Sequence, residues 1–256
     1  MIITLTTDFG LADPFVGMMK GVILGIAPNT QLVDLTHDIT SYDILEAALV
    51  IQGSYRYFPK GTVHIVVVDP GVGSERRPLV AVSDGHIFVA PDNGVLSLIV
   101  DSAPVYQITN ESLFQGPVSR TFHGRDIFAP VAAHLVRGTP VESVGQRIVD
   151  FVKKPLPKPR PQGDRLVGTV LRIDKFGNII TNLRPENLGD EFSIQVAGLS
   201  ITRLCGTFAE ADPGEFVAIE GSTGFIELAL NQGSAAERLS VERGTEIELE
   251  TNRLNQ

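Results

Sequence analysis

The stretch His64-Ile-Val-Val-Val-Asp-Pro-Gly-Val-Gly-Ser-Glu-Arg76 joins an apolar run to a carboxylate, a glycine-rich turn and an arginine. The run before Asp69 consists of His and β-branched residues between two turn signals, which predicts a buried strand. Asp69 then stands at the carboxyl end of that strand, the edge where open α/β sheets bind ligands. Arg76 is near enough to pair with Asp69 or with a bound anion. A strand, a turn and a surface ion pair explain this stretch alone equally well.

Strand and helix patterns alternate on both sides of this stretch. Strands are predicted at residues 2–7, 31–35, 64–68, 78–83 and 86–90, the last two as a hairpin around Asp84-Gly85. Helices are predicted at residues 14–26, 43–57 and 127–135, with a further helix after the turn Pro91-Asp-Asn-Gly94. This alternation predicts an α/β domain over residues 1–152, with a largely parallel sheet.

The character of the sequence changes after residue 152. Residues 153–163 carry a proline at every second position from 155 to 161, which excludes a helix and favours an extended, stiff linker. Residues 164–256 contain short alternating runs between Gly, Asp and Asn turns, at 165–173, 178–183, 191–196, 199–204, 215–219, 225–230 and 246–250. These runs predict a smaller C-terminal antiparallel β-barrel domain, with a sandwich as the alternative.

Composition narrows the class of protein. The 256 residues carry 21 Lys and Arg against 30 Asp and Glu, a net charge of −9, and the cations form no stripe, so nucleic acid is not an expected partner. The lone Cys205 excludes an internal disulfide and a multi-cysteine zinc site. With no signal peptide and no apolar window of about 18 residues, we expect a cytoplasmic protein without a membrane partner.

Three loops of the first predicted domain carry chemically useful side chains. They supply Asp8 with Asp13, Asp69 with Arg76, and His123 with Arg125 and Asp126. If these loops converge, an imidazole, a guanidinium and a carboxylate are suited to hold a water or hydroxide, with the His exchanging its proton near neutral pH. Turn capping, helix capping and a hydrogen-bonded scaffold His are the ordinary alternatives for each residue taken singly.

Other chemistries find weaker support. His37, Asp38, Asp8, Asp69 and His123 include the donors that zinc or iron accept, but no His-x-x-x-His or His-x-x-Glu-His arrangement is present, so no metal is expected. Gly71-Val-Gly73 lacks the third glycine of the dinucleotide fingerprint. In the second predicted domain, the turn Asp174-Lys-Phe-Gly-Asn178 suits a flat polar ligand, although a plain β-turn uses the same residue types.

Six ordered blocks of the chain carry glycines beside acidic, basic or amide side chains. They are Thr6-Thr-Asp-Phe-Gly10 with Asp13, Val16-Gly17 and Lys20-Gly21; Asp69-Pro-Gly-Val-Gly73 with Arg76; Pro91-Asp-Asn-Gly94; Phe122-His-Gly-Arg-Asp126; Asp174-Lys-Phe-Gly-Asn178 with Thr181-Asn182; and Gly221-Ser-Thr-Gly-Phe225 with Asn231. Together, from residue 2 to about residue 240, they resemble the S-adenosyl-L-methionine (SAM) hydroxide adenosyltransferases, relatives of the SAM-dependent fluorinase and chlorinase. The resemblance implies hydrolysis of SAM to adenosine and L-methionine, by attack of water or hydroxide at the ribose C5′, without a cofactor.

The resemblance also implies a role for each matching position. The residues that handle water fall on Asp69, Arg76 and His123. The substrate-binding residues fall on Asp8, Asp13, Tyr42, Asp174, Phe176, Asn178, Ser222, Phe225 and Asn231. Of these, Asp8 corresponds to the carboxylate that holds the ribose hydroxyls, and Tyr42 to an aromatic near the sugar. The family's site also implies a homotrimer, in which the second domain of one subunit completes the site of its neighbour.

The halogenases of this group differ from the chain at decisive positions. Where this chain has Asp69 they resemble one another in carrying Tyr, and they lack the matching Arg and His. Leu230 stands where the fluorinase has an Arg, so the fluorinase's contact with the adenine edge does not transfer. A SAM halogenase and a binding protein that senses SAM or adenosine without turnover are the alternatives to the hydrolase, and a metal-dependent hydrolase is a more distant one.

Overall fold

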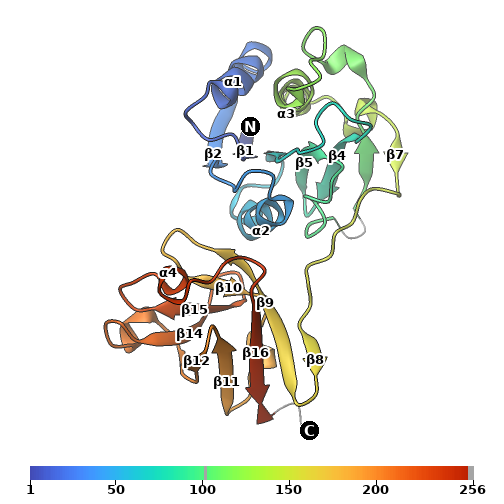
Figure 1. Cartoon of the computed structure of the whole chain (residues 1–256). Coiled ribbons are helices and arrows are strands. Elements are labelled where there is room, and N and C mark those ends of the chain that lie inside the picture. Colours follow the sequence, from blue (N-terminus) through green and yellow to red (C-terminus); the bar gives the residue numbers. More distant parts are fainter. Residues whose placement is uncertain (101–102, 253–256) are drawn as a thin grey trace. The chain divides into compact units, whose positions relative to one another are not determined.

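The computed structural model describes residues 1–100 and 103–252, which form two compact units, Met1–Pro155 and Leu156–Gln256 (Figure 1). The division falls within the proline-rich segment. In each unit an apolar core fills the space between a sheet and the elements that cover it.

A seven-stranded sheet with the order β2-β1-β3-β5-β4-β6-β7 forms the centre of the first unit. Its strands are β1 (Ile2–Thr7), β2 (Gln31–Thr36), β3 (Val63–Val67), β4 (Pro78–Ser83), β5 (His86–Pro91), β6 (Val105–Gln107) and β7 (Arg147–Ile148). The ladders β2-β1, β1-β3 and β3-β5 are parallel, whereas β5-β4, β4-β6 and β6-β7 are antiparallel. The prediction of a largely parallel sheet is therefore confirmed only for one half, because the tight turn at Asp84-Gly85 makes β4 run back along β5.

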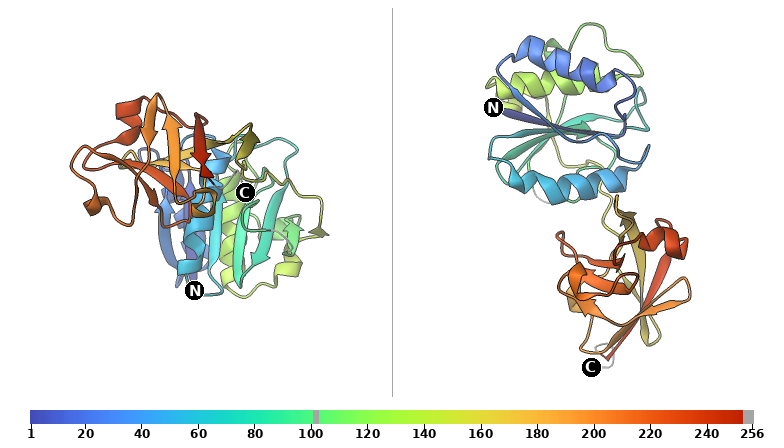
Figure 2. Two further views of the ribbon diagram at one scale, coloured as in Figure 1. Left: turned by 90° about the horizontal axis from the view of Figure 1, so that it is seen from below. Right: turned by 90° about the vertical axis from the view of Figure 1, so that its left-hand side faces the viewer.

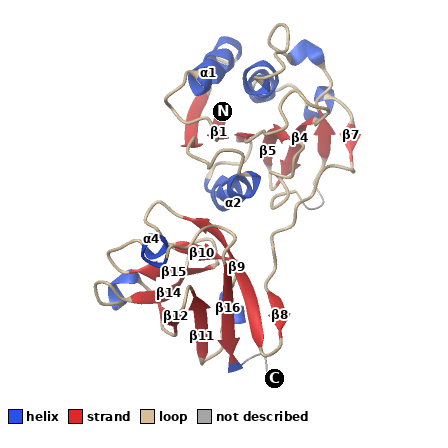
Figure 3. Ribbon diagram, viewed as in Figure 1, coloured by secondary structure: helices blue, strands red, loops and turns tan. Residues whose placement is uncertain are grey.

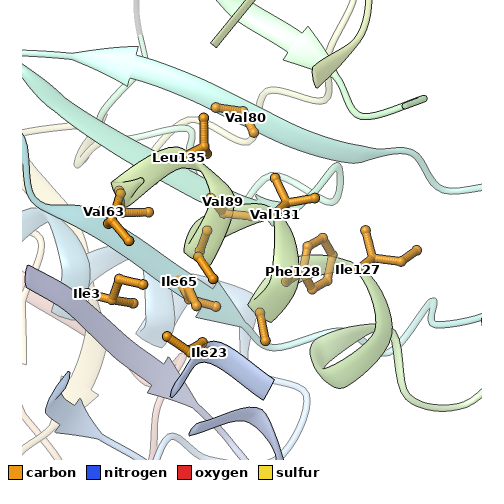
Figure 4. Close-up of a cluster of buried hydrophobic side chains, with 14 of the residues drawn as sticks. Ile3, Ile23, Val63, Ile65, Val80, Val89, Ile127, Phe128, Val131 and Leu135 are labelled. Carbon is orange, nitrogen blue, oxygen red and sulfur yellow. The ribbon is translucent and has the colours of Figure 1, made fainter. Parts of the chain in front are cut away.

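Helices cover both faces of this sheet. Its α-helices are α1 (Phe15–Ile26), α2 (Ile44–Ser54) and α3 (Ala129–Val136), with short helical turns η1 (Tyr55–Tyr57), η2 (Glu111–Leu113) and η4 (Val141–Val144) and the π-helical turn η3 (Gly124–Phe128). Helices α1 and α3 pack on one face and α2 on the other (Figure 2). Side chains from β1, β3, α1 and η3 meet in the core between α1, α3 and the sheet, among them Ile3, Ile65, Ile23 and Phe128 (Figure 4).

The prediction of a helix after Pro91-Asp-Asn-Gly94 is wrong, because bends and turns occupy residues 92–99. The side chain of Asn93 explains the difference, because its Nδ2 donates to Val68 O at 2.8 Å and its Oδ1 accepts from Val95 N at 3.1 Å. A side chain that binds nearby backbone groups in this way competes with helix formation. Gly94, with φ at +96°, adds a conformation outside the helical region.

Buried histidines lie at the amino ends of two neighbouring strands. His64 on β3 is fully buried, with Nδ1 2.7 Å from Thr4 Oγ1 and Nε2 3.2 Å from His86 Nδ1. Its ring stacks on Phe88 at 5.0 Å. Burial, reinforced by repulsion from His86, lowers the pKa of His64 from 6.5 to about 3.

We expect this histidine to make the fold sensitive to acid. Its folded pKa lies below its unfolded value of 6.5, so its neutral form stabilises the fold fully above pH 6.5, and that contribution is lost as the pH falls toward about 3. At roughly 1.4 kcal/mol per pKa unit, the loss amounts to several kcal/mol. In urea unfolding between pH 7 and pH 4, His64→Leu should reduce the dependence of unfolding free energy on pH, and a dependence equal to the parent's would contradict the assignment. At His134, a less buried histidine, burial also lowers the pKa, so the comparison variant His134→Leu should reduce that dependence less than His64→Leu does.

The second unit consists mainly of a curled sheet with the order β12-β11-β16-β9-β10-β15-β14-β13, and β8 pairs with β9 (Figure 3). Its strands are β8 (Arg160–Gln162), β9 (Arg165–Ile173), β10 (Ile179–Thr181), β11 (Phe192–Val196), β12 (Leu199–Ile201), β13 (Leu204–Cys205), β14 (Phe216–Glu220), β15 (Ile226–Leu230) and β16 (Glu246–Thr251). The predicted antiparallel barrel is confirmed only in part: the sheet is curled and mostly antiparallel, but β13 and β14 pair in parallel.

Two elements of the second unit differ from the prediction. Strand β8 lies in the segment predicted as linker, because the residues around Pro161 are already extended and pair with β9. Helix α4 (Ala235–Leu239) was not predicted, although Ser234 caps it by accepting from Glu237 N. The pair Ser234 and Glu237 has the spacing of a capping box, which is the signal that predicts such a start. The turns η5 (Pro185–Asn187) and η6 (Phe208–Glu210) complete the unit.

Candidate active site

The structure brings together three predicted site residues at the carboxyl end of β3. Asp69 Oδ1 accepts a hydrogen bond from Arg76 Nε at 3.0 Å, and Asp69 Oδ2 pairs with Arg76 Nη2. The same Nη2 contacts His123 Nδ1 at 2.6 Å. The side chains of Asp69 and Arg76 are only 5% and 8% exposed, so water competes little for this ion pair. Arg76 is therefore the centre of a bridge between a carboxylate and an imidazole.

This bridge fixes the proton of His123. Because an arginine only donates hydrogen bonds, His123 Nδ1 must accept, and the neutral ring carries its proton on Nε2. Burial, followed by the charge of Arg76, lowers the pKa of His123 below its ordinary value of 6.5. The guanidinium of Arg76 also lies 5.3 Å from the centre of the Phe128 ring, and its buried Nη1 has no hydrogen-bond partner among residues 1–100 and 103–252. The bridge thus leaves two N–H donors that do not take part in it, a buried one on Arg76 Nη1 and one on His123 Nε2.

A glycine turn holds the two loops of this site against each other. Gly73 has φ at +76°, and a Cβ placed on it would lie 2.1 Å from Arg120 O. Only a glycine allows this approach between the loop after β3 and the loop before His123. The close backbone contact therefore sets the separation across which Arg76 reaches His123.

Asp8 and Tyr42 form a second group of predicted residues, at the end of β1. Strands β1 and β3 are parallel neighbours in which Thr7 pairs with Val67, so Asp8 and Asp69 lie at the same edge of the sheet. Asp8 Oδ2 accepts from Tyr42 N at 2.9 Å. Tyr42 has φ at +69°, a strained conformation for a non-glycine residue, and its side chain is 70% exposed. Asp13 lies exposed in the loop before α1.

An aromatic cluster that sequence reasoning missed joins the loops of Asp8 and His123. Phe9, Phe15 and Phe122 pack edge to face, with ring centres 5.3–6.0 Å apart. Phe9 follows Asp8 directly, and Phe122 precedes His123. The available signal was a phenylalanine beside each polar candidate, but nothing in the spacing of these residues indicated that they meet.

In the second unit, Asp174 organises its own turn. Its Oδ1 accepts from Phe176 N at 2.8 Å and from Asn178 N at 2.9 Å, and its Oδ2 accepts from Asn178 Nδ2 at 2.9 Å. Both carboxylate oxygens therefore act within the β-turn that the sequence allowed as the ordinary alternative. The turn leaves Phe176 77% exposed, which presents a flat apolar surface to solvent.

A pocket of about 460 Å³ adjoins this turn and contains three of the predicted residues. It is lined by Phe176, Asn178, Phe208, Leu230, Asn231, Gln232 and Gly233. Phe208, Gln232 and Gly233 were not predicted, and the signal for Phe208 was an aromatic residue in a polar, glycine-containing stretch. Ser222 and Phe225 do not line this pocket, and Phe225 is buried with the guanidinium of Arg184 4.4 Å from its ring centre.

Within residues 1–100 and 103–252, no group of three or more His, Cys, Asp or Glu side chains is arranged to hold a metal ion. In the same part of the chain, every helix is too short or too polar to cross a membrane.

Comparison with known proteins identifies the family of both units. Residues 3–145 match the SAM hydroxide adenosyltransferase N-terminal domain, and residues 168–248 match the C-terminal domain of the same family. A protein of Salinispora tropica named (R)-S-adenosyl-L-methionine hydrolase is 37% identical over 255 residues, 96% of each chain, and a fluorinase of Nocardia brasiliensis is 29% identical over 289 residues, 97% of this chain and 96% of the other. The crystal structure of an uncharacterized conserved protein from Thermotoga maritima superimposes with a TM-score of 0.87 at 37% identity, covering 97% of this chain and 99% of that one. The chain therefore belongs to the SAM hydroxide adenosyltransferase family.

Proposed function

We propose that this protein hydrolyses SAM to adenosine and L-methionine. The observation that carries the proposal is the bridge of Arg76 between Asp69 and His123, which offers N–H groups to an oxygen nucleophile and differs from the halogenase pattern. The hydrolase of Salinispora tropica, which is more similar to this chain than the fluorinase of Nocardia brasiliensis, gives independent support.

The reaction requires the protein mainly to align the nucleophile with the C5′–S bond. An oxygen of water or hydroxide forms a bond to C5′ while the C5′–S bond breaks, and the electron pair goes to sulfur to give neutral methionine. A water nucleophile releases one proton to solvent. The sulfonium is already a good leaving group, so the proposal includes neither a metal nor a cofactor. Alignment of the two reacting groups contributes up to roughly 7–11 kcal/mol in ideal cases.

The proton positions in the bridge suggest the role of each side chain. Arg76 Nη1 and His123 Nε2 donate to the nucleophilic oxygen, so His123 orients this oxygen and does not deprotonate it. Asp69 holds the guanidinium in place and balances its charge, which keeps a buried cation from standing unpaired. A carboxylate at this position also repels a halide, in keeping with hydrolysis.

We assign the substrate contacts to residues of both units. Asp8 binds the ribose hydroxyls, with Tyr42 beside the sugar and Asp13 in the adjoining loop. Phe176 and Phe208 suit the faces of a purine, while Asn178 and Asn231 supply amide groups at the rim of the same pocket. Asp174, Ser222 and Phe225 complete the substrate-binding set implied by the resemblance. A cytoplasmic homotrimer remains part of the proposal, and the mass of the protein in solution tests its oligomeric state.

The reaction is tested by incubating the protein with SAM in water enriched in ¹⁸O. We expect equimolar adenosine and methionine, with the label in the adenosine 5′-hydroxyl and none in methionine. The position of the label distinguishes attack at C5′ from other cleavages of SAM. Parallel reactions with chloride and with fluoride should give the same products.

Each alternative has its own signature in this assay. Formation of a 5′-halo-adenosine that depends on the halide would identify a halogenase. Stoichiometric retention of adenosine or SAM without turnover would identify a binding protein. Either result would overturn the proposed hydrolase.

A further inference from the structure

A chain of polar contacts lies behind the loop of Asp8. Thr7 Oγ1 is 2.8 Å from His37 Nδ1, and His37 Nε2 is 3.0 Å from Asp34 Oδ1. Asp34 Oδ2 in turn accepts from Lys20 Nζ at 2.6 Å. Thr7 is fully buried and His37 is 4% exposed, whereas Asp34 and Lys20 reach the surface. The contacts thus run from solvent to the carboxyl end of β1.

The donors and acceptors of these contacts follow from the carboxylate of Asp34. Because His37 Nε2 lies 3.0 Å from Asp34 Oδ1, a neutral His37 ring carries its proton on Nε2 and accepts at Nδ1 from the hydroxyl of Thr7. Thr7 Oγ1 in turn accepts from Phe9 N at 3.2 Å. Partial burial raises the pKa of Asp34, but its contacts with Lys20 and His37 outweigh this and lower the pKa overall, which keeps it ionised. Thr7 and Lys20 therefore have hydrogen-bond partners in this series of contacts, whereas His37 Nε2 lies within ion-pair distance of Asp34 without a regular hydrogen bond.

A local irregularity of β2 makes these contacts possible. In the ladder with β1, Leu5 pairs with Asp34 whereas Thr6 pairs with Thr36, so one extra residue is inserted in β2. Residues three positions apart in a regular strand point to opposite faces, but an extra residue resets this alternation. The bulge thereby allows Asp34 and the following His37 to meet.

The chain of contacts anchors the backbone on both sides of Asp8. Thr7 precedes Asp8 and binds Phe9 N, and His37 O accepts from Gly10 N at 2.8 Å. Asp8 lies between these two anchor points, with its own carboxylate directed at Tyr42 N. The ring of His37 holds the Thr7 hydroxyl that accepts from Phe9 N, and the backbone of His37 holds Gly10 N, so both parts of His37 restrain the loop of Asp8.

We propose that Thr7, His37 and Asp34 are positioning residues that hold Asp8 in the orientation needed to bind the 2′,3′-diol of a ribose. The inference rests on the proposed function, which supplies the ribose. Asp34 fixes the ring of His37 through the contact at Nε2, and this ring fixes the hydroxyl of Thr7 through Nδ1. The loop of Asp8 is then held by Thr7 Oγ1 at Phe9 N and by His37 O at Gly10 N. A carboxylate that is already oriented binds the diol more tightly, because the loop does not lose conformational entropy when the ligand binds.

The test compares two ligands that differ only in the diol. Asp34→Ala removes the acceptor for His37 Nε2 at a partly exposed position where folding tolerates change. By calorimetry, we expect this variant to bind adenosine about tenfold more weakly than the parent and 2′,3′-dideoxyadenosine equally well. Asp34→Asn keeps an acceptor oxygen and should restore most of the affinity, and Lys20→Met leaves His37 and Asp34 in contact and should behave as the parent. Thr7→Val, which removes the hydroxyl at the other end, should reproduce the loss.

The outcomes separate this inference from the function on which it rests. A parent that binds adenosine, together with an Asp34→Ala variant that loses no affinity or loses it equally for both ligands, overturns the positioning role alone. A parent that neither binds adenosine nor hydrolyses SAM overturns the proposed function and the inference with it.

Discussion

Asp69→Asn should lower kcat for SAM hydrolysis about a thousandfold, or roughly 4 kcal/mol in activation free energy. The asparagine has nearly the same shape, but its amide directs N–H groups or one neutral oxygen at Arg76, where the carboxylate now accepts from both Nε and Nη2. The guanidinium is then free to turn away from His123 and from the nucleophile. Initial rates of adenosine release at saturating SAM measure this effect.

A second ion pair in the same unit provides the control, the variant Asp92→Asn. Asp92 has a side chain 4% exposed and pairs with Arg77 at 2.7 Å, away from the bridge of Arg76 and His123. Weakening a buried ion pair costs about 3–5 kcal/mol of stability, so Asp69→Asn and Asp92→Asn should both lower the unfolding free energy. Only Asp69→Asn should lower kcat. Similar losses of kcat in both variants, or a kcat of Asp69→Asn within tenfold of the parent, would contradict the assignment.

The sequence predicted the strands of the first unit well because local signals mark them. The β-branched run after Thr62 predicts strand β3, and the turn at Asp84-Gly85 predicts the hairpin of β4 and β5. Strands β6 and β7 were not predicted, because they are short and their pairing depends on contacts between distant segments. The same limit applies to the curl of the second sheet, where the parallel pairing of Leu204 with Ala218 carries no local signature.

For the candidate site, the sequence supplied the groups but not their arrangement. The spacing of Asp69 and Arg76 allowed an ion pair between them. The approach of His123, 47 positions along the chain from Arg76, was only a condition on how the loops converge until the family resemblance supported it. The position of the proton on the His123 ring could not be predicted from the sequence, because it follows from the contact with Arg76. The network of His37 was missed because its geometry depends on a bulge, which alternation of apolar and polar residues does not reveal.

Gly73→Ala should damage both stability and catalysis, although it adds a single methyl group at a residue with no functional atom. The left-handed conformation alone costs an alanine about 1–2 kcal/mol. The added Cβ would also lie 2.1 Å from Arg120 O and 3.1 Å from Arg120 C, so the backbone of one loop has to move. That movement separates Arg76 from His123, and a displacement of about 1 Å costs about a hundredfold in rate. Urea unfolding and kcat measure the two effects.

Gly61→Ala separates the strain of the backbone from the closeness of the two loops. Gly61 has φ at +84°, similar to that of Gly73, but nothing lies within 4 Å of a Cβ placed there. We therefore expect this control to lose about 1–2 kcal/mol of stability and to keep its kcat. The ring NMR signals of His123 should shift in Gly73→Ala and stay unchanged in Gly61→Ala. If both variants kept kcat and the His123 signals, the contact between Gly73 and Arg120 would not be what sets the distance from Arg76 to His123.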